Sequence, residues 1–148
     1  MTITAAEEAL GTKLATLETS DSGASEECWY TQRVDRVDPL VSYMIWNGKI
    51  VRIDIDESEL GSAERSVPSI SSDKGISIGS TESDIKRAYG SRVIVSPHPY
   101  GNGDENSHYF LVASRDKQHG LLFETLDSRV NTFRNGLLEA IKLIEGCS

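Results

Sequence analysis

Two short segments of the chain have the pattern of amphipathic helices that begin at a hydroxyl side chain and end at a glycine. Residues 1–11 and 80–90 each start near a serine or threonine, carry acidic residues in the first turn and stop at glycine. In the second segment Thr81 is followed three residues later by Asp84, as in a capping box. We therefore predict one short helix in each segment. The apolar stripe of the second helix, at positions i, i+3 and i+4, is Ile85, Ala88 and Tyr89.

Short stretches in which apolar and polar positions alternate follow these segments and are typical of antiparallel strands. Asn47-Gly48 lies between two such stretches and is a strong hairpin signal, because both central positions of a type I′ turn need positive φ. Asp127-Ser128 occupies the corresponding place in the second half. In that half, strands are predicted around residues 93–95, 108–113, 121–125 and 130–134.

The two halves of the chain have similar patterns at a nearly constant spacing, which indicates an internal repeat. Residues 1–11 align with 80–90 at a spacing of 79, and the segments around Cys28 and around Asn47-Gly48 align at a spacing of 80. Identity is low, so chance similarity is the alternative. Duplication predicts an α+β fold that is a tandem repeat of a short helix plus an antiparallel β-meander, with both halves in one domain. The predicted parts of this single domain, 1–148, are repeat 1 at about 1–55, a connector at 56–74, repeat 2 at about 75–134 with a short strand at 75–79, and a C-terminal segment at 135–148.

Composition narrows the class of protein. With 148 residues, 38% of them hydrophobic and 26% charged, the chain is globular rather than disordered or collagen-like. A formal charge of -8 repels phosphate backbones, so generic nucleic-acid binding is not expected. No window reaches the roughly 20 apolar residues that span a bilayer. The start of the chain lacks the pattern of a secretory signal, so either the protein is cytosolic or a leader has been removed.

The densest group of polar and aromatic residues is the loop between His98 and His108. With Asp104 and Glu105, these histidines supply ligand types that could hold a divalent metal. No pair has the i, i+4 or Cys-x-x-Cys type of separation that makes a metal motif specific. The favoured interpretation is therefore a solvated loop bent by its glycines, with no metal and no cofactor.

Signals for catalysis are weak. The chain has histidines and many serines, but it has no Gly-x-Ser-x-Gly elbow, and neither cysteine has a recognisable catalytic context. Glu124, on a predicted strand, could act as a general acid if buried, although such a residue more often accepts a hydrogen bond or faces water. Residues 75–81 lack the lysine and the spacing of a phosphate-binding loop. We therefore predict that the protein is not an enzyme.

Four aromatic residues of the first half fall on neighbouring predicted strands. If exposed, they would make a recognition surface, but strand alternation places some of them in the core. Trp46, beside the Asn47-Gly48 turn, is the best candidate for exposure. The four residues are Trp29, Tyr30, Tyr43 and Trp46.

Several motifs together resemble an uncharacterised family of small exported bacterial proteins. They are Gly75–Glu82, Tyr89-Gly90, Pro97–Tyr100, Leu122–Thr125, Phe133-Arg134 and the terminal Glu145-Gly146-Cys147. More distantly, the pattern is similar to BamE-like outer-membrane assembly lipoproteins and to the secreted β-lactamase inhibitor proteins. The resemblance implies a periplasmic or secreted location and an α+β tandem repeat, and it transfers no activity. The chain lacks the second cysteine pair of those inhibitors and a lipobox cysteine.

The resemblance also favours a disulfide between Cys28 and Cys147. The bond would fasten a C-terminal segment that otherwise frays to the start of a predicted strand. In the chain-entropy model such a long closed loop stabilises by about 4 to 5 kcal/mol. Two buried free thiols in a cytosolic protein are the alternative.

Taken together, these features predict an exported or periplasmic binding protein that engages another protein, as an inhibitor, an immunity factor or an envelope-assembly factor. The negative charge makes a basic partner the natural complement. The alternative is a small-molecule- or metal-binding or hydrolytic domain that uses the His98 to His108 loop. No oligomeric state is predicted. The predicted binding residues are Trp46, His98, Tyr100, Asp104, Glu105 and His108.

Overall fold

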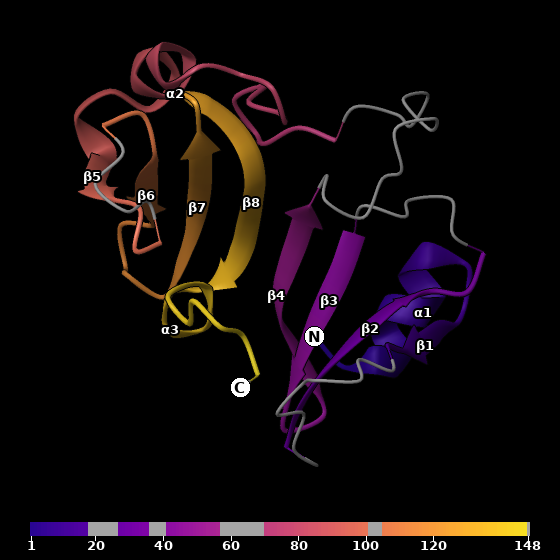
Figure 1. The fold of residues 1–148 in the computed structure, drawn as a ribbon. Coiled ribbons are helices and arrows are strands. Elements are labelled where there is room, and N and C mark those ends of the chain that lie inside the picture. The colour runs from indigo at the N-terminus through magenta and orange to yellow at the C-terminus, as the bar shows by residue number, and fades with distance from the viewer. Residues whose placement is uncertain (18–26, 36–40, 57–69, 101–104, 148) are drawn as a thin grey trace.

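The computed structural model describes residues 1–17, 27–35, 41–56, 70–100 and 105–147. Eight strands of this described part form one antiparallel sheet in the order β1-β2-β3-β4-β8-β7-β6-β5 (Figure 1). The two central strands, β4 and β8, come from opposite halves of the chain and pair directly. The strands are β1 Leu14–Thr16, β2 Cys28–Arg33, β3 Val41–Trp46, β4 Lys49–Asp56, β5 Val93–Pro97, β6 His108–Ala113, β7 His119–Leu126 and β8 Arg129–Leu137.

The helices are short, and the first two begin where their sequence patterns predict. At the start of α1 (Ile3–Leu10), the Thr2 hydroxyl accepts a hydrogen bond from the Ala5 backbone N–H. At the start of α2 (Glu82–Tyr89), Thr81 and Asp84 form the predicted reciprocal capping box. A short 3-10 helix η1 (Gly90–Arg92) follows α2, and α3 (Leu138–Ile141) directly follows β8.

The predicted α+β fold of two helix-plus-meander repeats is wrong, because the protein is mostly β. The α-helices are only eight, eight and four residues long, whereas the strands form one continuous eight-stranded antiparallel sheet. Local patterns identified helices and strands but carried no information on the pairing of β4 with β8, which merges all the strands into a single sheet. The repeat boundaries and the internal duplication stay predictions.

The hairpin turns and the later strands were predicted well, whereas one short strand was not. Asn47 and Gly48 have φ of 50° and 73°, and Asp127 and Ser128 have φ of 50° and 61°, as a type I′ turn requires. The four strands predicted in the second half are confirmed as β5 to β8. The strand predicted at 75–79 is wrong: this segment holds only one residue of an isolated bridge, and its two terminal glycines turn the chain with positive φ.

The two faces of the sheet differ in chemistry. One face carries the main apolar core, in which Ile85 and Tyr89 of α2 and Leu10 of α1 pack against the strands. The opposite face is partly covered by α3, through contacts of Ala140 with Met44 and of Ile141 with Leu122 and Tyr109. We call the first the apolar face and the second the polar face.

The predicted disulfide is present. Cys28, the first residue of β2, is bonded to Cys147, with a Cα–Cα distance of 5.4 Å. It fastens the segment after α3 to the polar face, where Gly146 packs against the Tyr30 hydroxyl. A disulfide is compatible with an oxidising extracellular or periplasmic environment. None of the described helices is long and apolar enough to cross a membrane.

Candidate functional site

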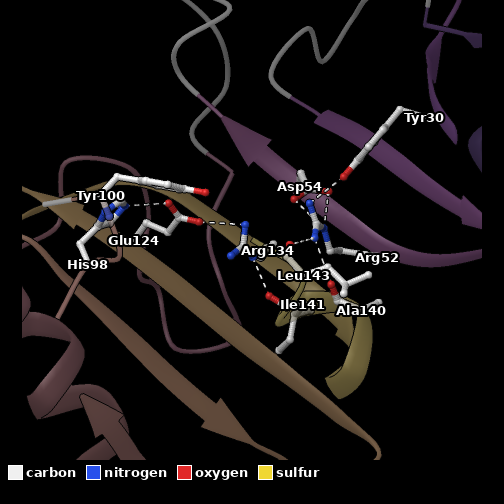
Figure 2. Close-up of polar contacts among 10 residues, drawn as sticks. All are labelled: Tyr30, Arg52, Asp54, His98, Tyr100, Glu124, Arg134, Ala140, Ile141 and Leu143. Atoms are coloured by element: carbon white, nitrogen blue, oxygen red, sulfur yellow. Dashed lines mark hydrogen bonds and ion pairs between the residues drawn. The ribbon is translucent and has the colours of Figure 1, made fainter. Parts of the chain in front are cut away.

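A row of charged and phenolic side chains crosses the centre of the polar face (Figure 2). It runs from Glu124 on β7 to Arg134 on β8, and then to Arg52 and Asp54 on β4 and Tyr30 on β2. Strand register explains the alignment, because Asp54 is paired with Arg134 across the β4–β8 junction. Residues two apart on one strand, such as Arg52 and Asp54, point to the same face. The row therefore joins the two halves of the chain.

Arg52 is buried, and each of its three guanidinium nitrogens donates at least one hydrogen bond. Its Nε donates to the Asp54 carboxylate at 2.9 Å, and its Nη2 donates to the Tyr30 hydroxyl at 2.7 Å. Its Nη1 donates to the backbone carbonyls of Ala140 at 3.0 Å and Leu143 at 2.8 Å. Arg52 thus fixes α3 and the following segment to the sheet and is a structural residue of the site.

Burial is the largest cause of the pKa shifts of Asp54 and Tyr30, which surround Arg52. It raises the pKa of Asp54, an effect that the neighbouring Arg52 guanidinium opposes through its charge and hydrogen bond. It also raises the pKa of the Tyr30 phenol, and the negative charge of Asp54 acts in the same direction. These shifts mark a poorly hydrated environment, in which charge interactions are stronger than at an ordinary surface.

Arg134 is the residue of the row with unused hydrogen-bonding capacity. Only 8% of its side chain is exposed. Its Nη1 pairs with a Glu124 oxygen at 2.8 Å, and its Nε donates to the Ile141 carbonyl at 2.7 Å. Its Nη2 is shielded from water and has no hydrogen-bond partner. An unsatisfied buried donor costs about 1–3 kcal/mol, more when charged. The guanidinium also lies over the Tyr109 ring, 5.7 Å from its centroid, and this contact offsets part of that cost.

The other end of the row is held by His98. Its Nε2 lies 3.3 Å from the second Glu124 oxygen, and its ring stands edge-on to Tyr109 with the centroids 4.8 Å apart. Burial raises the pKa of Tyr109, and the charge of Glu124 raises it further. The Tyr100 hydroxyl donates to the Glu145 carboxylate at 2.5 Å, which links the loop after β5 to the C-terminal segment. Glu124 is therefore held between two nitrogen donors, on Arg134 and His98.

A recess of about 390 Å³ opens on this face, and we call it the polar recess. Among the described residues, its lining includes three uncharged polar side chains, Gln32, Ser42 and Thr132. The charged groups among these described residues are four carboxylates and two guanidiniums. They are Asp54, Asp56, Glu124 and Glu145, with Arg52 and Arg134. A second, mainly apolar cavity of about 590 Å³ lies against α1, β4 and β8.

Some of the predicted site residues lie at the polar recess. His98 contacts Glu124, which lines it, and Tyr100, with 58% of the residue exposed, contacts Glu145 on its edge. The stretch around Tyr30, considered above as core or recognition surface, also contributes, since Tyr30 lines the recess directly.

The remaining predicted site residues are placed elsewhere. His108 contacts Glu82 of α2 at 2.8 Å, on the apolar side of the sheet, so it does not meet His98. Glu105 is exposed in the turn before β6, and Asp104 lies outside the described residues. Trp46 is half-buried at the end of β3, paired with Cys28, and does not line the recess. The described residues include no group of three metal-ligating side chains placed to hold an ion.

Sequence reasoning missed the arginines at the centre of the site. A usable signal was present in β4, where charged residues occupy the alternate positions 52, 54 and 56 of a strand with apolar residues between them. Such a strand has one charged face, and a charged face on a central strand has to be paired or used for binding. Arg134 gave no such signal, because its importance depends on the β4–β8 register.

In comparisons with known proteins, no protein-family model, no curated protein and no solved structure matches the chain.

Proposed function

We propose that the protein is a non-enzymatic binding protein that engages another protein through the polar recess. The observation that carries this proposal is Arg134, whose Nη2 is a buried donor without a partner at a recess of about 390 Å³. A group supplied by a partner would satisfy this donor and recover the cost of leaving it unpaired.

The surroundings of the recess are suited to protein recognition. Tyrosine and arginine are enriched among residues that dominate binding energy at interfaces, and Tyr30, Tyr100 and Arg134 lie in or beside the recess. The recess is built on strands of a continuous sheet and braced by the disulfide, so its side chains are preorganised. Preorganisation reduces the entropy that binding removes.

The pairing of charges favours binding over catalysis. A general acid or base must be free to give or take a proton and must lie within hydrogen-bond reach of the substrate. Here Glu124 interacts with both Arg134 and His98, and Asp54 interacts with Arg52. These carboxylates are occupied in holding the site together, which suits a rigid recognition surface.

We assign the protein to the bacterial envelope or the secreted fraction, as an inhibitor, immunity or envelope-assembly factor. The Cys28–Cys147 disulfide supports an oxidising compartment, and the motifs that resemble small exported proteins support the same location. The negative charge of the chain, -8, supports a basic partner, because complementary charge accelerates association and excludes partners of like charge.

Site-specific photocrosslinking tests this function. A benzoylphenylalanine at Gln32, on the wall of the recess, should give a covalent adduct of defined mass when the protein is mixed with envelope and secreted fractions. The control carries the same group at Arg115, an exposed residue that does not line the recess. Mass spectrometry then identifies the adduct. No adduct, or equal adducts from both positions, would contradict the proposal.

A further inference from the structure

We infer that the Cys28–Cys147 disulfide is a redox latch, which holds one wall of the polar recess in place and releases it on reduction. The wall is the segment that follows α3, residues 142–147, which we call the strap. This inference rests on the proposed function, because it names what regulates binding at the polar recess. A dithiol reductant opens the latch, and the recess then loses part of its lining.

The strap contributes directly to the polar recess. Its residues Ile144, Glu145 and Gly146 belong to the lining. Gly146 packs so closely against the Tyr30 hydroxyl that no side chain would fit between them. The Glu145 carboxylate also accepts a hydrogen bond from the Tyr100 hydroxyl. Movement of the strap therefore changes both the shape of the recess and the polar groups that it presents.

Apart from the disulfide, few contacts in the described part of the chain fasten the strap. Arg52 donates to one backbone carbonyl of the strap at 2.8 Å, and Tyr100 donates to Glu145. Residues 142–145 are exposed, and within the strap only Cys147 is buried. The net gain from one hydrogen bond is similar to, or smaller than, the entropic cost of ordering the backbone of one residue. These contacts therefore do not keep the whole strap ordered once the sulfur bridge is open.

The helix α3, by contrast, has anchors of its own. Ala140 and Ile141 are fully buried against the polar face. Arg52 donates to the Ala140 carbonyl at 3.0 Å, and Arg134 donates to the Ile141 carbonyl at 2.7 Å. Opening of the latch should therefore free the chain from Lys142 onward and leave α3 and the eight-stranded sheet in place.

The opening reaction is a two-electron thiol–disulfide exchange. A thiolate of the reductant attacks one sulfur of the bridge, so that a mixed disulfide forms and the other cysteine leaves as a thiolate, which takes up a proton. The second thiol of the reductant then attacks the mixed disulfide and releases the second cysteine. The protein disulfide is thereby reduced to two thiols, and the two thiols of the reductant are oxidised to a disulfide. The reductant is by class a protein dithiol of the Cys-x-x-Cys type.

Amide ¹⁵N relaxation of the full chain tests the latch. The oxidised protein is compared with the protein in excess dithiothreitol, and the double variant Cys28→Ser, Cys147→Ser is recorded with and without the same reagent. We expect the order parameters of the strap to fall from about 0.85 to below about 0.6 on reduction, while those of α3 and β8 stay near 0.85. The variant should have a mobile strap under both conditions. A strap that stays rigid after reduction would overturn the inference, and so would loss of structure throughout the sheet.

Tyr100→Phe is the matched control for the non-covalent contacts of the strap. In the oxidised protein this variant loses the hydrogen bond to Glu145 but keeps the disulfide, so the strap should stay ordered. If Tyr100→Phe alone freed the strap, the hydrogen bond rather than the sulfur bridge would be the latch, and the inference would fail.

Photocrosslinking at Gln32 then measures whether the latch controls binding. Reduction should lower the yield of the adduct about fivefold, because a mobile wall has to be ordered again when the partner binds. The double variant Cys28→Ser, Cys147→Ser should give the same low yield without any reductant, which separates the effect of the bridge from other effects of the reagent.

The two proposals can fail separately. An equal yield of adduct from the oxidised and the reduced protein would leave the proposed function standing and overturn the latch. No adduct from either form would contradict the proposed function and with it the control of binding, and the relaxation measurement alone would then decide whether the disulfide holds the strap.

Discussion

Beneath α2, the strands β6, β7 and β8 contribute Phe110, Phe123 and Phe133 to an apolar core. The residues next to these phenylalanines on the same strands point to the polar face. There the neighbours of the three phenylalanines are Tyr109, Glu124 and Arg134. The two sets lie on opposite sides of one sheet and share its backbone hydrogen bonds. The sheet is thus stabilised from one face and charged on the other.

This difference separates residues that stabilise the fold from residues that form the proposed binding site. Burial of aromatic side chains is favourable in proportion to their apolar area, whereas a buried ion pair often contributes little net stability. Replacement on the apolar face should therefore destabilise the protein. Replacement on the polar face should change binding, pH dependence and the attachment of the C-terminal segment.

The largest effect is expected for Phe123→Ala. Phe123 is fully buried and packs against Tyr89 and Phe133, with ring centroids 5.8 and 5.7 Å apart. The cavity should lower the free energy of unfolding by about 3–5 kcal/mol. Urea denaturation followed by circular dichroism measures this change. A loss below about 1 kcal/mol would mean that the site repacks and that the apolar face is not the main source of stability.

Removal of the disulfide comes next. The double variant Cys28→Ser, Cys147→Ser should lose about 2–5 kcal/mol, because the bond closes a long loop in the unfolded chain and holds the C-terminal segment on the polar face. Denaturation of the oxidised protein, the reduced protein and the variant measures this loss. Reduced protein and variant should agree, and a variant as stable as the oxidised protein would contradict the expected role of the bond.

Tyr89→Phe tests a polar contact at the border of the apolar face. The Tyr89 hydroxyl donates to the Asp73 carboxylate at 2.7 Å and lies 2.9 Å from the Ser72 hydroxyl, so its removal should cost about 1–2 kcal/mol at neutral pH. Burial raises the pKa of Tyr89 from 10.0 to about 12. Because the folded pKa is the higher one, this stabilisation is complete below pH 10 and is lost as pH rises toward about 12. Unfolding of both proteins across this pH range should show their stabilities converge.

The smallest effect is expected on the polar face, for Asp54→Asn. Burial raises the pKa of Asp54 above its ordinary 3.8, so folding costs less when Asp54 is protonated than when it is ionised. The stabilisation from this shift is present in acid and is lost as pH rises through the raised pKa. Asparagine imitates the protonated form without titrating. The stability of the variant relative to the wild type should therefore increase with pH, and a pH-independent difference would show that Arg52 compensates fully for burial.

Local sequence patterns predicted the parts of the molecule that depend on neighbours in sequence. The capping box of Thr81 and Asp84 and the Asn47-Gly48 turn depend on residues within one turn or one hairpin, and both are present. The disulfide was predicted mainly from a resemblance. The fold class was wrong because the pairing of β4 with β8 joins segments that are distant in sequence, and no local pattern reports it.

The same limit explains what was missed at the site. His98 and Tyr100 were noticed because aromatic and imidazole groups are conspicuous in a sequence, and they lie beside the recess. Nothing in the local sequence distinguishes Arg134 from an exposed arginine on a strand. Its role depends on the strand register, which pairs it with Asp54. The opposite placement of His98 and His108 likewise follows from the direction in which each side chain leaves the sheet, which the spacing of the two residues does not encode.

The disulfide also decides which part of this protein can carry mechanical load. If the molecule is pulled at Thr2 and Cys147, tension passes from Cys28 straight across the sulfur bridge, and the loop between the bonded residues, with a separation of 119, bears none. Only the segment from Thr2 to Cys28 can be drawn out, to roughly 90 Å for about 26 residues at ~3.5 Å each. The edge strand β1 would peel away together with Leu17, while the other described residues that line the polar recess stay in place. In the reduced protein the same pull would extend about 145 residues to roughly 500 Å and would dismantle the recess.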